Sequence, residues 1–421
     1  MVGRDVEEFD SGYGESSRYA AHLDRGWALL DRGDVVAART SVEHAQEVRP
    51  DDPDASVLLG AIALAEGDPN EALRCYERAV ELDPEYLEPY VAAAQVCLFD
   101  LEDPVKAQRF CDDALELERL SPFEAVDVRL LSAECQLSRD DKRAPAGVEE
   151  LTRPEHLGVV IKTLELAARG PTDGDLEHDD IAVVQAAEYL LLDIDGELLD
   201  EEERRDRVAR AFQLVMRWAR LTLDLGDVSG ATEQLQALTT WFPDEADAWY
   251  LLGEAQLRGR DVMRAAEASL RTLELDARGD LPSWVPPVNL LQRRVLQALQ
   301  RAEVPAIADA IDQDRPLAVL IQERPAPELV TEGVDPRIPV LALGTRIDPE
   351  APSLTLVGLA VYVANIARVC RDATQFEDEL RLSIADELKV FFSEPAPVPA
   401  DPAPDADKKK GRRKRRTRAK A

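Results

Sequence analysis

The hydrophobic positions of the first 120 residues recur with helical spacing, and they fall into pairs of helices joined by short turns. Alanines and larger apolar residues form one face of each predicted helix, and acidic and basic residues form the other. Turn residues stand between paired helices at Gly33-Asp34 and Gly67-Asp68, and each pair ends at a proline, Pro50 or Pro84. This pattern predicts an array of helical hairpins.

The array is periodic. Gly33-Asp34, Ala38, Ala45 and Pro50 return 34 residues later as Gly67-Asp68, Ala72, Ala79 and Pro84. Gly26 and Gly60, also 34 residues apart, occupy positions where two helices are expected to cross closely. A fixed period of this length indicates a solenoid, in which each hairpin buries its apolar face against the next.

Three more units follow the first two. The third runs from Leu87 to about Leu120, with Ala94, Ala107 and Ala114 at the equivalent places after a one-residue slip near Asp100. The pattern then returns in two units, which carry Ala219, Gly226-Asp227, Ala231 and Pro243, and then Trp249, Gly253, Asp261 and Ala265. Between them, residues 122–138, 156–168 and 181–192 predict diverged helices, and residues 170–180 predict a loop.

With these residues, the chain resembles the tetratricopeptide-repeat (TPR) family over about 17–120 and 207–278. The resemblance implies a right-handed superhelix with a concave groove formed by the first helix of each unit, and thus an adaptor that binds a protein partner. The inward positions that it implies as partner-binding are Leu23, Trp27, Val57, Ala61, Val91, Gln95 and Tyr250. The alternative is that Trp27 and the aliphatic residues pack between repeats.

The residue types at these positions favour one kind of partner over another. The TPR domains that clamp chaperone C-termini hold a carboxylate with lysine and asparagine, whereas the comparable positions here are Leu23, Trp27, Ala61 and Gln95. An apolar protein segment suits them better than a free carboxylate.

The pattern of hydrophobic and polar residues changes after Gly279. A helix is predicted at 289–310, extended runs at 317–321, 339–343 and 353–361, and a closing helix at 375–392. Elements in this order predict a small α+β domain.

This α+β segment is similar to the minimal zincin-like metallopeptidase domain of bacteria, through residues 317–329, 354–356 and 368–387. In that family the last helix carries HExxH, whose histidines bind zinc and whose glutamate activates water. Here the five residues are Asp386-Glu387-Leu388-Lys389-Val390, and only Glu387 matches. The resemblance therefore implies a degenerate domain, a pseudo-metallopeptidase that needs no metal or other cofactor. A zinc protein with other ligands is the alternative.

The charge distribution defines a further segment, a basic run at the C-terminus. The net charge is −33, but residues 408–420 carry ten bases and no acid, so the first 407 residues, with 40 bases and 83 acids, sum to −43. The run could bind nucleic acid or anionic membrane without base recognition, or fold back on the acidic body. The residues expected to contact nucleic acid are Lys408, Arg412, Arg413, Lys414, Arg415 and Arg416.

The expected compartment is the cytoplasm. The first residues are polar and acidic, and no run approaches the ~18 apolar residues that a membrane span needs. The five cysteines, an odd number without CxxC spacing, indicate reduced core thiols.

The sequence thus predicts a mostly α-helical, non-enzymatic protein-interaction scaffold. The expected segments are a disordered N-terminus (1–16), repeats 1–3 (17–120), diverged helices with an acidic loop (121–206), further repeats (207–280), a degenerate zincin-like domain (281–393) and a disordered linker and basic tail (394–421).

Overall fold

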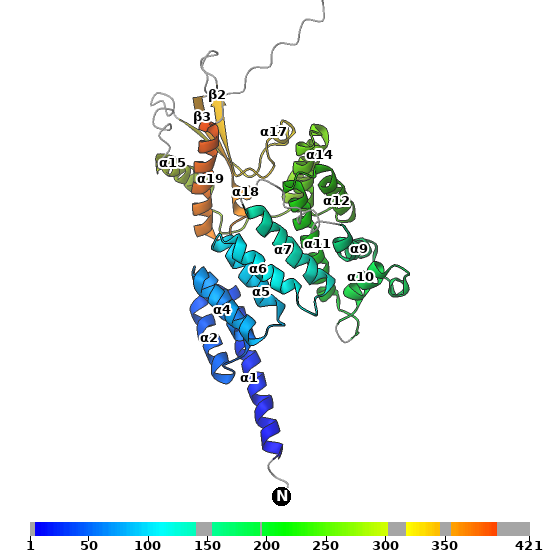
Figure 1. Ribbon diagram of the computed structural model, residues 1–421. Coiled ribbons are helices and arrows are strands. Elements are labelled where there is room, and N and C mark those ends of the chain that lie inside the picture. The colour runs from blue at the N-terminus through cyan, green and yellow to red at the C-terminus, as the bar shows by residue number, and fades with distance from the viewer. Residues whose placement is uncertain (1–4, 140–153, 194–195, 302–316, 346–354, 394–421) are drawn as a thin grey trace, which may run out of the picture. The chain divides into compact units, whose positions relative to one another are not determined.

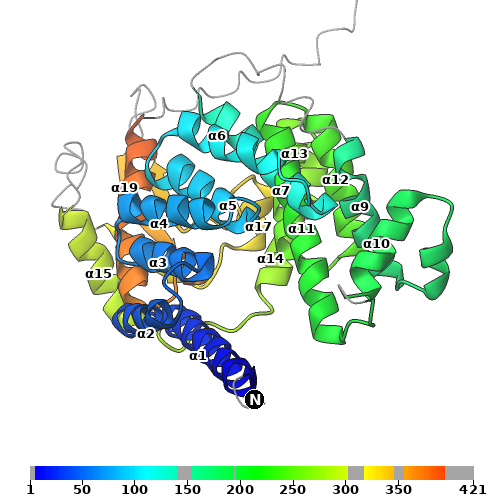
Figure 2. The ribbon, with the colours of Figure 1, turned by 60° about the horizontal axis from the view of Figure 1, so that its bottom comes forward.

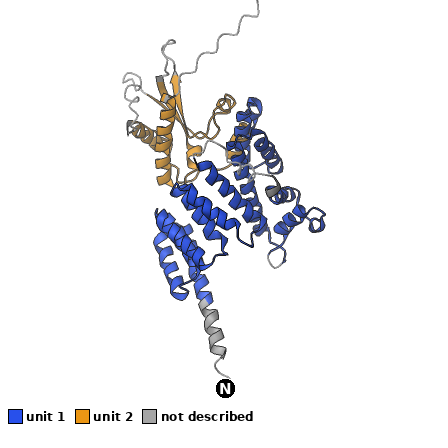
Figure 3. Cartoon of the chain, in the orientation of Figure 1, with its two compact units in different colours: residues 1–268 blue, residues 269–421 orange. Residues whose placement is uncertain are grey.

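The computed structural model describes residues 5–139, 154–193, 196–301, 317–345 and 355–393 (Figure 1). The chain divides into two compact units, residues 1–268 and 269–421 (Figure 3). Across the described residues, no helix combines the length and the apolar character that a membrane span requires. The linker and the basic tail, residues 394–421, lie outside the described part.

Unit 1 is helical, and its paired helices confirm the TPR-like repeats predicted from the sequence. The pairs α3/α4 and α5/α6 lie side by side in both views (Figures 1 and 2). The helices are α1 (Asp5–Asp31), α2 (Val35–Val48), α3 (Pro53–Ala65), α4 (Pro69–Leu82), α5 (Leu87–Gln95), α6 (Pro104–Leu115), α7 (Pro122–Ser138), α9 (Pro154–Arg169), α10 (Ile181–Leu191), α11 (Glu201–Asp224), α12 (Val228–Trp241), α13 (Ala246–Arg258) and α14 (Val262–Asp276), which continues into unit 2.

Helix α1 starts earlier than expected. Residues 1–16 were predicted to be disordered, but α1 begins at Asp5 and runs without a break to Asp31. The first helix of the array is therefore longer than the periodic pattern alone indicates.

The turns inside the repeats share one construction. Asp34, Asp68, Asp103 and Asp227 each cap the second helix of a unit by accepting a hydrogen bond from the N–H three residues on, at 2.9 to 3.2 Å. Asp261 accepts the same hydrogen bond in the last unit, from Arg264 N–H at 3.3 Å. In all five turns the residue before the aspartate has a positive φ, which glycine adopts without strain. That residue is Gly33, Gly67 and Gly226 in three units, but it is Glu102 (φ 52°) and Arg260 (φ 63°) in the other two.

The one-residue slip in the third unit has a structural cause. Residues Val96–Asp100, directly after α5, form a π-helical turn, in which Leu101 N–H donates to the carbonyl of Val96 at 3.0 Å. A π turn adds one residue to a helix while the flanking residues keep their faces. The π turn accommodates the extra residue of the third unit, and the repeat pattern continues in register in α6.

The close helix crossing predicted at the repeat glycines is confirmed. A Cβ built on Gly60 would lie 2.5 Å from Cε1 of Tyr76 on α4, and one built on Gly26 would lie 2.6 Å from Cδ2 of Leu58 on α3. Real Cβ atoms essentially never lie this close to a neighbour, so a larger residue at either position would force Tyr76 or Leu58 to shift within the core.

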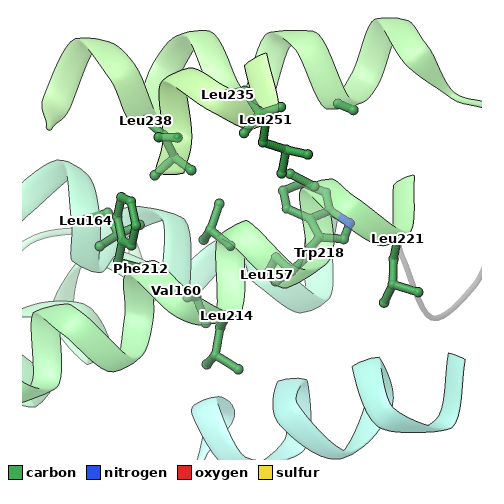
Figure 4. Packing of buried hydrophobic residues seen from close by; sticks show 14 of the residues in the cluster. Leu157, Val160, Leu164, Phe212, Leu214, Trp218, Leu221, Leu235, Leu238 and Leu251 are labelled. Carbon is green, nitrogen blue, oxygen red and sulfur yellow. The ribbon is translucent and has the colours of Figure 1, made fainter. Parts of the chain in front are cut away.

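Helix α7 links the early and late repeats. One of its faces, with Val128, Leu131 and Cys135, lies in a core shared with α3 to α6. Its other face, with Phe123 and Leu130, lies in a second core shared with α9, α11, α12 and α13. Figure 4 shows this second core, where Trp218 and Phe212 of α11 pack among leucines. The diverged helices α7 and α9 therefore continue the stack.

Unit 2 contains a three-stranded sheet, as predicted. Its strands are β1 (Ala318–Gln322), β2 (Val340–Thr345) and β3 (Thr355–Tyr362), in the order β1-β3-β2, with β1 parallel and β2 antiparallel to β3. Helices α15 (Val288–Arg301) and α19 (Ala373–Ser393) share one apolar core with the sheet, including Phe376, Leu359 and Val361. Two short helices, α17 (Pro327–Thr331) and α18 (Val363–Ala367), complete the unit.

We predict that Arg260→Gly stabilises unit 1 by about 0.5–1 kcal/mol. The substitution removes the strain of a left-handed backbone conformation at a residue with a Cβ, and this gain exceeds the loss that results from the greater conformational entropy of glycine in the unfolded chain. Urea denaturation of the full chain measures this change. Gly67→Ala, at the equivalent turn, should destabilise by a similar amount. A loss of stability in Arg260→Gly would show that the arginine side chain matters more than its backbone.

Candidate partner-binding surface

Three of the predicted partner-binding residues belong to the repeat cores. Leu23 on α1 is 8% exposed, and Val57 on α3 is 3% exposed. Trp27 is partly buried and packs against the cores on both sides of it. For these residues the structure matches the alternative of packing between repeats, and Leu23 and Val57 offer a partner almost no surface.

The other predicted residues keep accessible surface. Ala61 on α3, Val91 on α5 and Tyr250 on α13 are half-buried, and Gln95 at the end of α5 is exposed. All of them lie on the first helix of a unit. A partner could therefore touch α3 and α5 mainly through small aliphatic side chains and the Gln95 amide.

The later repeats present charge on their first helices. Arg217 on α11 makes a bidentate pair with Glu134 on α7, with Nε–Oε1 and Nη2–Oε2 distances of 2.6 and 2.7 Å. Its Nη1 also donates to Asp127 on α7 at 2.6 Å. Burial lowers the pKa of Arg217, but the two carboxylates raise it by more, so the pKa lies above its ordinary value.

A second group of charges joins α11 to α13. Arg220 donates to Glu254 at 2.6 Å, and Glu254 also accepts from Arg258 at 2.6 Å. Arg258 lies 3.5 Å from Asp224. These charged side chains run across the first helices α7, α11 and α13 and keep between a fifth and a half of their surface exposed.

Sequence reasoning missed this charged row because it searched the inward positions for apolar residues. A signal was present in the period itself: Arg220 and Glu254 are 34 residues apart, and so are Asp224 and Arg258. Opposite charges at the repeat spacing on adjacent first helices predict ion pairs between repeats. The pairing of Arg217 has no such signal, since its partners lie 83 and 90 residues away.

The degenerate zincin motif lies on α19 in unit 2. Asp386 is exposed and pairs with Lys389 at 2.8 Å, and Val390 is 51% exposed. Glu387 is half-buried, and its Oε1 accepts a hydrogen bond from the N–H of Ala342 at 2.7 Å. Ala342 is on the edge strand β2, so the Glu387 carboxylate satisfies a backbone N–H at the edge of the sheet. Within the described ranges, no three His, Cys, Asp or Glu side chains gather as metal ligands would.

The geometry of unit 1 defines the chain as a helical-repeat protein, and comparison with known families identifies the repeat. The tetratricopeptide-repeat model matches residues 23–86 and 216–280, which are TPR repeats. The match covers two pairs of helical hairpins and ends before the sheet of unit 2. Comparison with curated proteins yields no match.

The solved structures to which the chain is similar include three proteins of low sequence identity. PilF of Pseudomonas aeruginosa is 16% identical over 62% of this chain and 93% of its own, with a TM-score of 0.41. PilW, a type IV pilus biogenesis factor, is 14% identical over 62% of this chain and 91% of its own, with a TM-score of 0.38. YrrB, a TPR protein with an unusual peptide-binding site, is 16% identical over 56% of this chain and 91% of its own, with a TM-score of 0.30.

We predict that Arg217→Met destabilises unit 1 by about 2 kcal/mol, because Glu134 and Asp127 would remain partly buried without their cation. The matched control is Arg205→Met on the same helix, whose pair with Glu201 is exposed and should contribute less than about 0.5 kcal/mol. Chemical denaturation of both variants gives the comparison. Equal effects would mean that the Arg217 pairs add no more than a surface ion pair.

We also predict that Glu387→Ala accelerates hydrogen exchange of the Ala342 amide by about tenfold, because the variant loses a charge-assisted hydrogen bond worth about 1.5 kcal/mol. Glu387→Gln keeps an acceptor oxygen and should preserve most of the protection. Asp386→Ala, at the exposed neighbouring position, is the control. Unchanged exchange at Ala342 in Glu387→Ala would rule out this structural role.

Proposed function

We propose that the protein is a non-enzymatic adaptor whose TPR repeats bind a segment of a partner protein. The observation that carries the proposal is the stack of TPR hairpins in unit 1, with first-helix side chains that remain accessible beside a rigid core. A stacked array of this kind offers an extended surface rather than an enclosed reaction site. Its five unpaired cysteines suit a reducing compartment, and we place the protein in the cytoplasm.

The proposed partner surface consists of Ala61 on α3, Val91 and Gln95 on α5, and the exposed part of Trp27 on α1. Small aliphatic groups beside one amide favour an apolar segment with few charges. On the later repeats, Arg220 and Arg258 are already neutralised by Glu254 and Asp224. These charges contribute to the choice of partner more than to affinity, because a partner must replace the pairs it disrupts.

For unit 2 we propose a docking or capping module related to the zincin-like domain without its chemistry. Three features support this. Asp386 and Val390 stand where the family has histidines, Asp386 is engaged by Lys389, and the carboxylate of Glu387 binds a backbone N–H. A glutamate that holds a sheet edge is not placed to activate water. Stoichiometric zinc in the purified protein, lost together with an activity on chelation, would overturn this part.

The basic run 408–420 is proposed as an auxiliary contact for polyanions. Ten bases behind a Pro- and Ala-rich linker neutralise phosphates without reading bases. Removing residues 408–421 should abolish any binding to RNA or DNA, and the salt dependence of that binding should disappear with it. Unchanged binding after the deletion would place the nucleic-acid contact elsewhere.

The adaptor function is tested by affinity purification of the full chain from its native host. We expect a partner protein that is captured by the wild type and lost in Gln95→Trp, because the indole would cover the exposed end of α5 without entering the core. Arg109→Trp is the matched control, since Arg109 is exposed on the second helix α6. Thermal melts should show both variants folded.

Two results would contradict the proposal. Partners retained equally by both variants would exclude the α5 surface. If no protein is captured by the wild type at near-native abundance, or if the purified chain turns over a substrate, the adaptor function itself is wrong.

A further inference from the structure

A cavity of about 550 Å³ lies in unit 1 beside the first half of α11, and its lining includes none of the partner-surface residues and none of the charged row on α7, α11 and α13 described above. It opens to the surface and is lined by the end of α9, helix α10, the first half of α11 and the residues that follow α12. Helix α10 and the loop before it interrupt the 34-residue pattern, so this cavity belongs to the insertion in the array. Its volume falls within the range of sites that hold small ligands or several side chains.

The floor of the cavity is apolar. Leu190 of α10 is fully buried, and Phe212 of α11 packs edge to face with Phe242 at 5.7 Å between ring centroids. Val208 lies one turn before Phe212 on α11 and completes this floor. Aromatic and aliphatic walls of this kind favour an apolar ligand group.

The loop that forms one wall is held firmly. Asp175 accepts hydrogen bonds from the N–H and the hydroxyl of Thr172, at 2.8 and 2.9 Å, and it pairs with Arg169 at the end of α9. The guanidinium of Arg169 and the Thr172 donors lower the pKa of Asp175 to about 2. This clasp fixes Pro171 at the cavity before any ligand arrives, which limits the ordering that binding would cost.

Within the described residues, no carboxylate forms an ion pair with Arg204, which lines the cavity. Arg204 of α11 donates to the carbonyl of Leu199 at 3.3 Å, and, among the residues that the structure describes, its Nε has no hydrogen-bond partner. Its neighbour Glu201 pairs instead with Arg205, while Glu245 lies exposed among the other lining residues. A guanidinium that binds only a carbonyl retains its preference for a carboxylate.

We propose that this cavity binds an apolar side chain of a partner protein and that an acidic residue next to that side chain pairs with Arg204. The inference rests on the proposed adaptor function, since it takes the ligand to be a peptide segment. A peptide suits the site because Ala209 and Gln213, on the open side of α11, are exposed and leave room for a chain to continue past the cavity. The insertion would then add a second anchor to the TPR surface.

The test uses a phage-displayed library of random peptides panned against the full chain, followed by fluorescence polarisation with synthetic copies of the enriched peptides. We expect enriched sequences with a large apolar residue beside Asp or Glu. Ala209→Trp should weaken their binding about tenfold or more by filling the cavity entrance. Ala168→Trp is the matched control, because Ala168 is an exposed alanine at the end of α9 that does not line the cavity, and it should change affinity less than about twofold.

The charge contact is tested separately. Arg204→Glu should weaken the acidic peptides about tenfold and should be rescued by peptides in which the acid is replaced by lysine. Circular dichroism melts establish that each variant is folded.

The outcomes separate this inference from the adaptor function. Enriched peptides that bind Ala209→Trp and the wild type equally but are lost in Gln95→Trp would overturn the cavity site and leave the adaptor function standing. Loss in Ala209→Trp without any effect of Arg204→Glu would overturn the acidic component. If no peptide is enriched by the wild type, both proposals are contradicted.

Discussion

Helix α7 must be buried on two opposite faces, and the continuity of unit 1 depends on this. The side with Val128, Leu131 and Cys135 completes the core of the early repeats, and the side with Phe123 and Leu130 opens the core of the late ones. A repeat array is stabilised mainly by contacts between neighbouring units, so one weak interface would divide it into two shorter arrays. The position of greatest sequence divergence is therefore the position where packing has to be retained. The Arg217 pairs add a directional contact at the same interface, since Glu134 and Asp127 also belong to α7.

Apolar packing and ion pairs have different effects in such an array. The buried leucines around Trp218 supply most of the stability of the late repeats, because burial of apolar area acts without regard to direction. The partly exposed pairs Arg217–Glu134 and Arg220–Glu254 add less free energy, but they define which turns of α7, α11 and α13 face each other. They also give the late first helices a charged surface, whereas α3 and α5 present aliphatic groups. A single partner segment that followed the whole array would therefore have to be apolar at one end and polar at the other.

The sequence predicts the parts of this fold that local chemistry controls. The roles of Gly60 and Asp68 can be predicted from a single repeat, because the close helix crossing and the helix cap each depend on one residue type at one position. The slip at Asp100 also marked a real irregularity, although the pattern could not tell a π turn from a longer loop. Contacts between distant segments could not be predicted from the pattern, since no residue near Arg217 in the sequence indicates that Glu134 is its partner. Burial on the first helices was also beyond the pattern, since periodicity places Leu23 and Val57 there but does not show that neighbouring helices cover them.

The insertion before α11 gives the repeat array a surface that differs from that of the regular units. A strictly periodic array repeats the same surface, so it gains a distinctive site most easily where the period is interrupted. Here α10 and the loop held by the Asp175–Arg169 pair lie beside α11, and the extended first half of that helix brings Arg204 and Val208 to the cavity that these elements line. Because α11 also carries Arg217 and Trp218 into the core shared with α7, one continuous helix connects the cavity to the interface that holds the array together. Binding at the cavity would thus act on a rigid element rather than on a flexible loop, and an ordered helix loses little conformational freedom when a ligand docks on it.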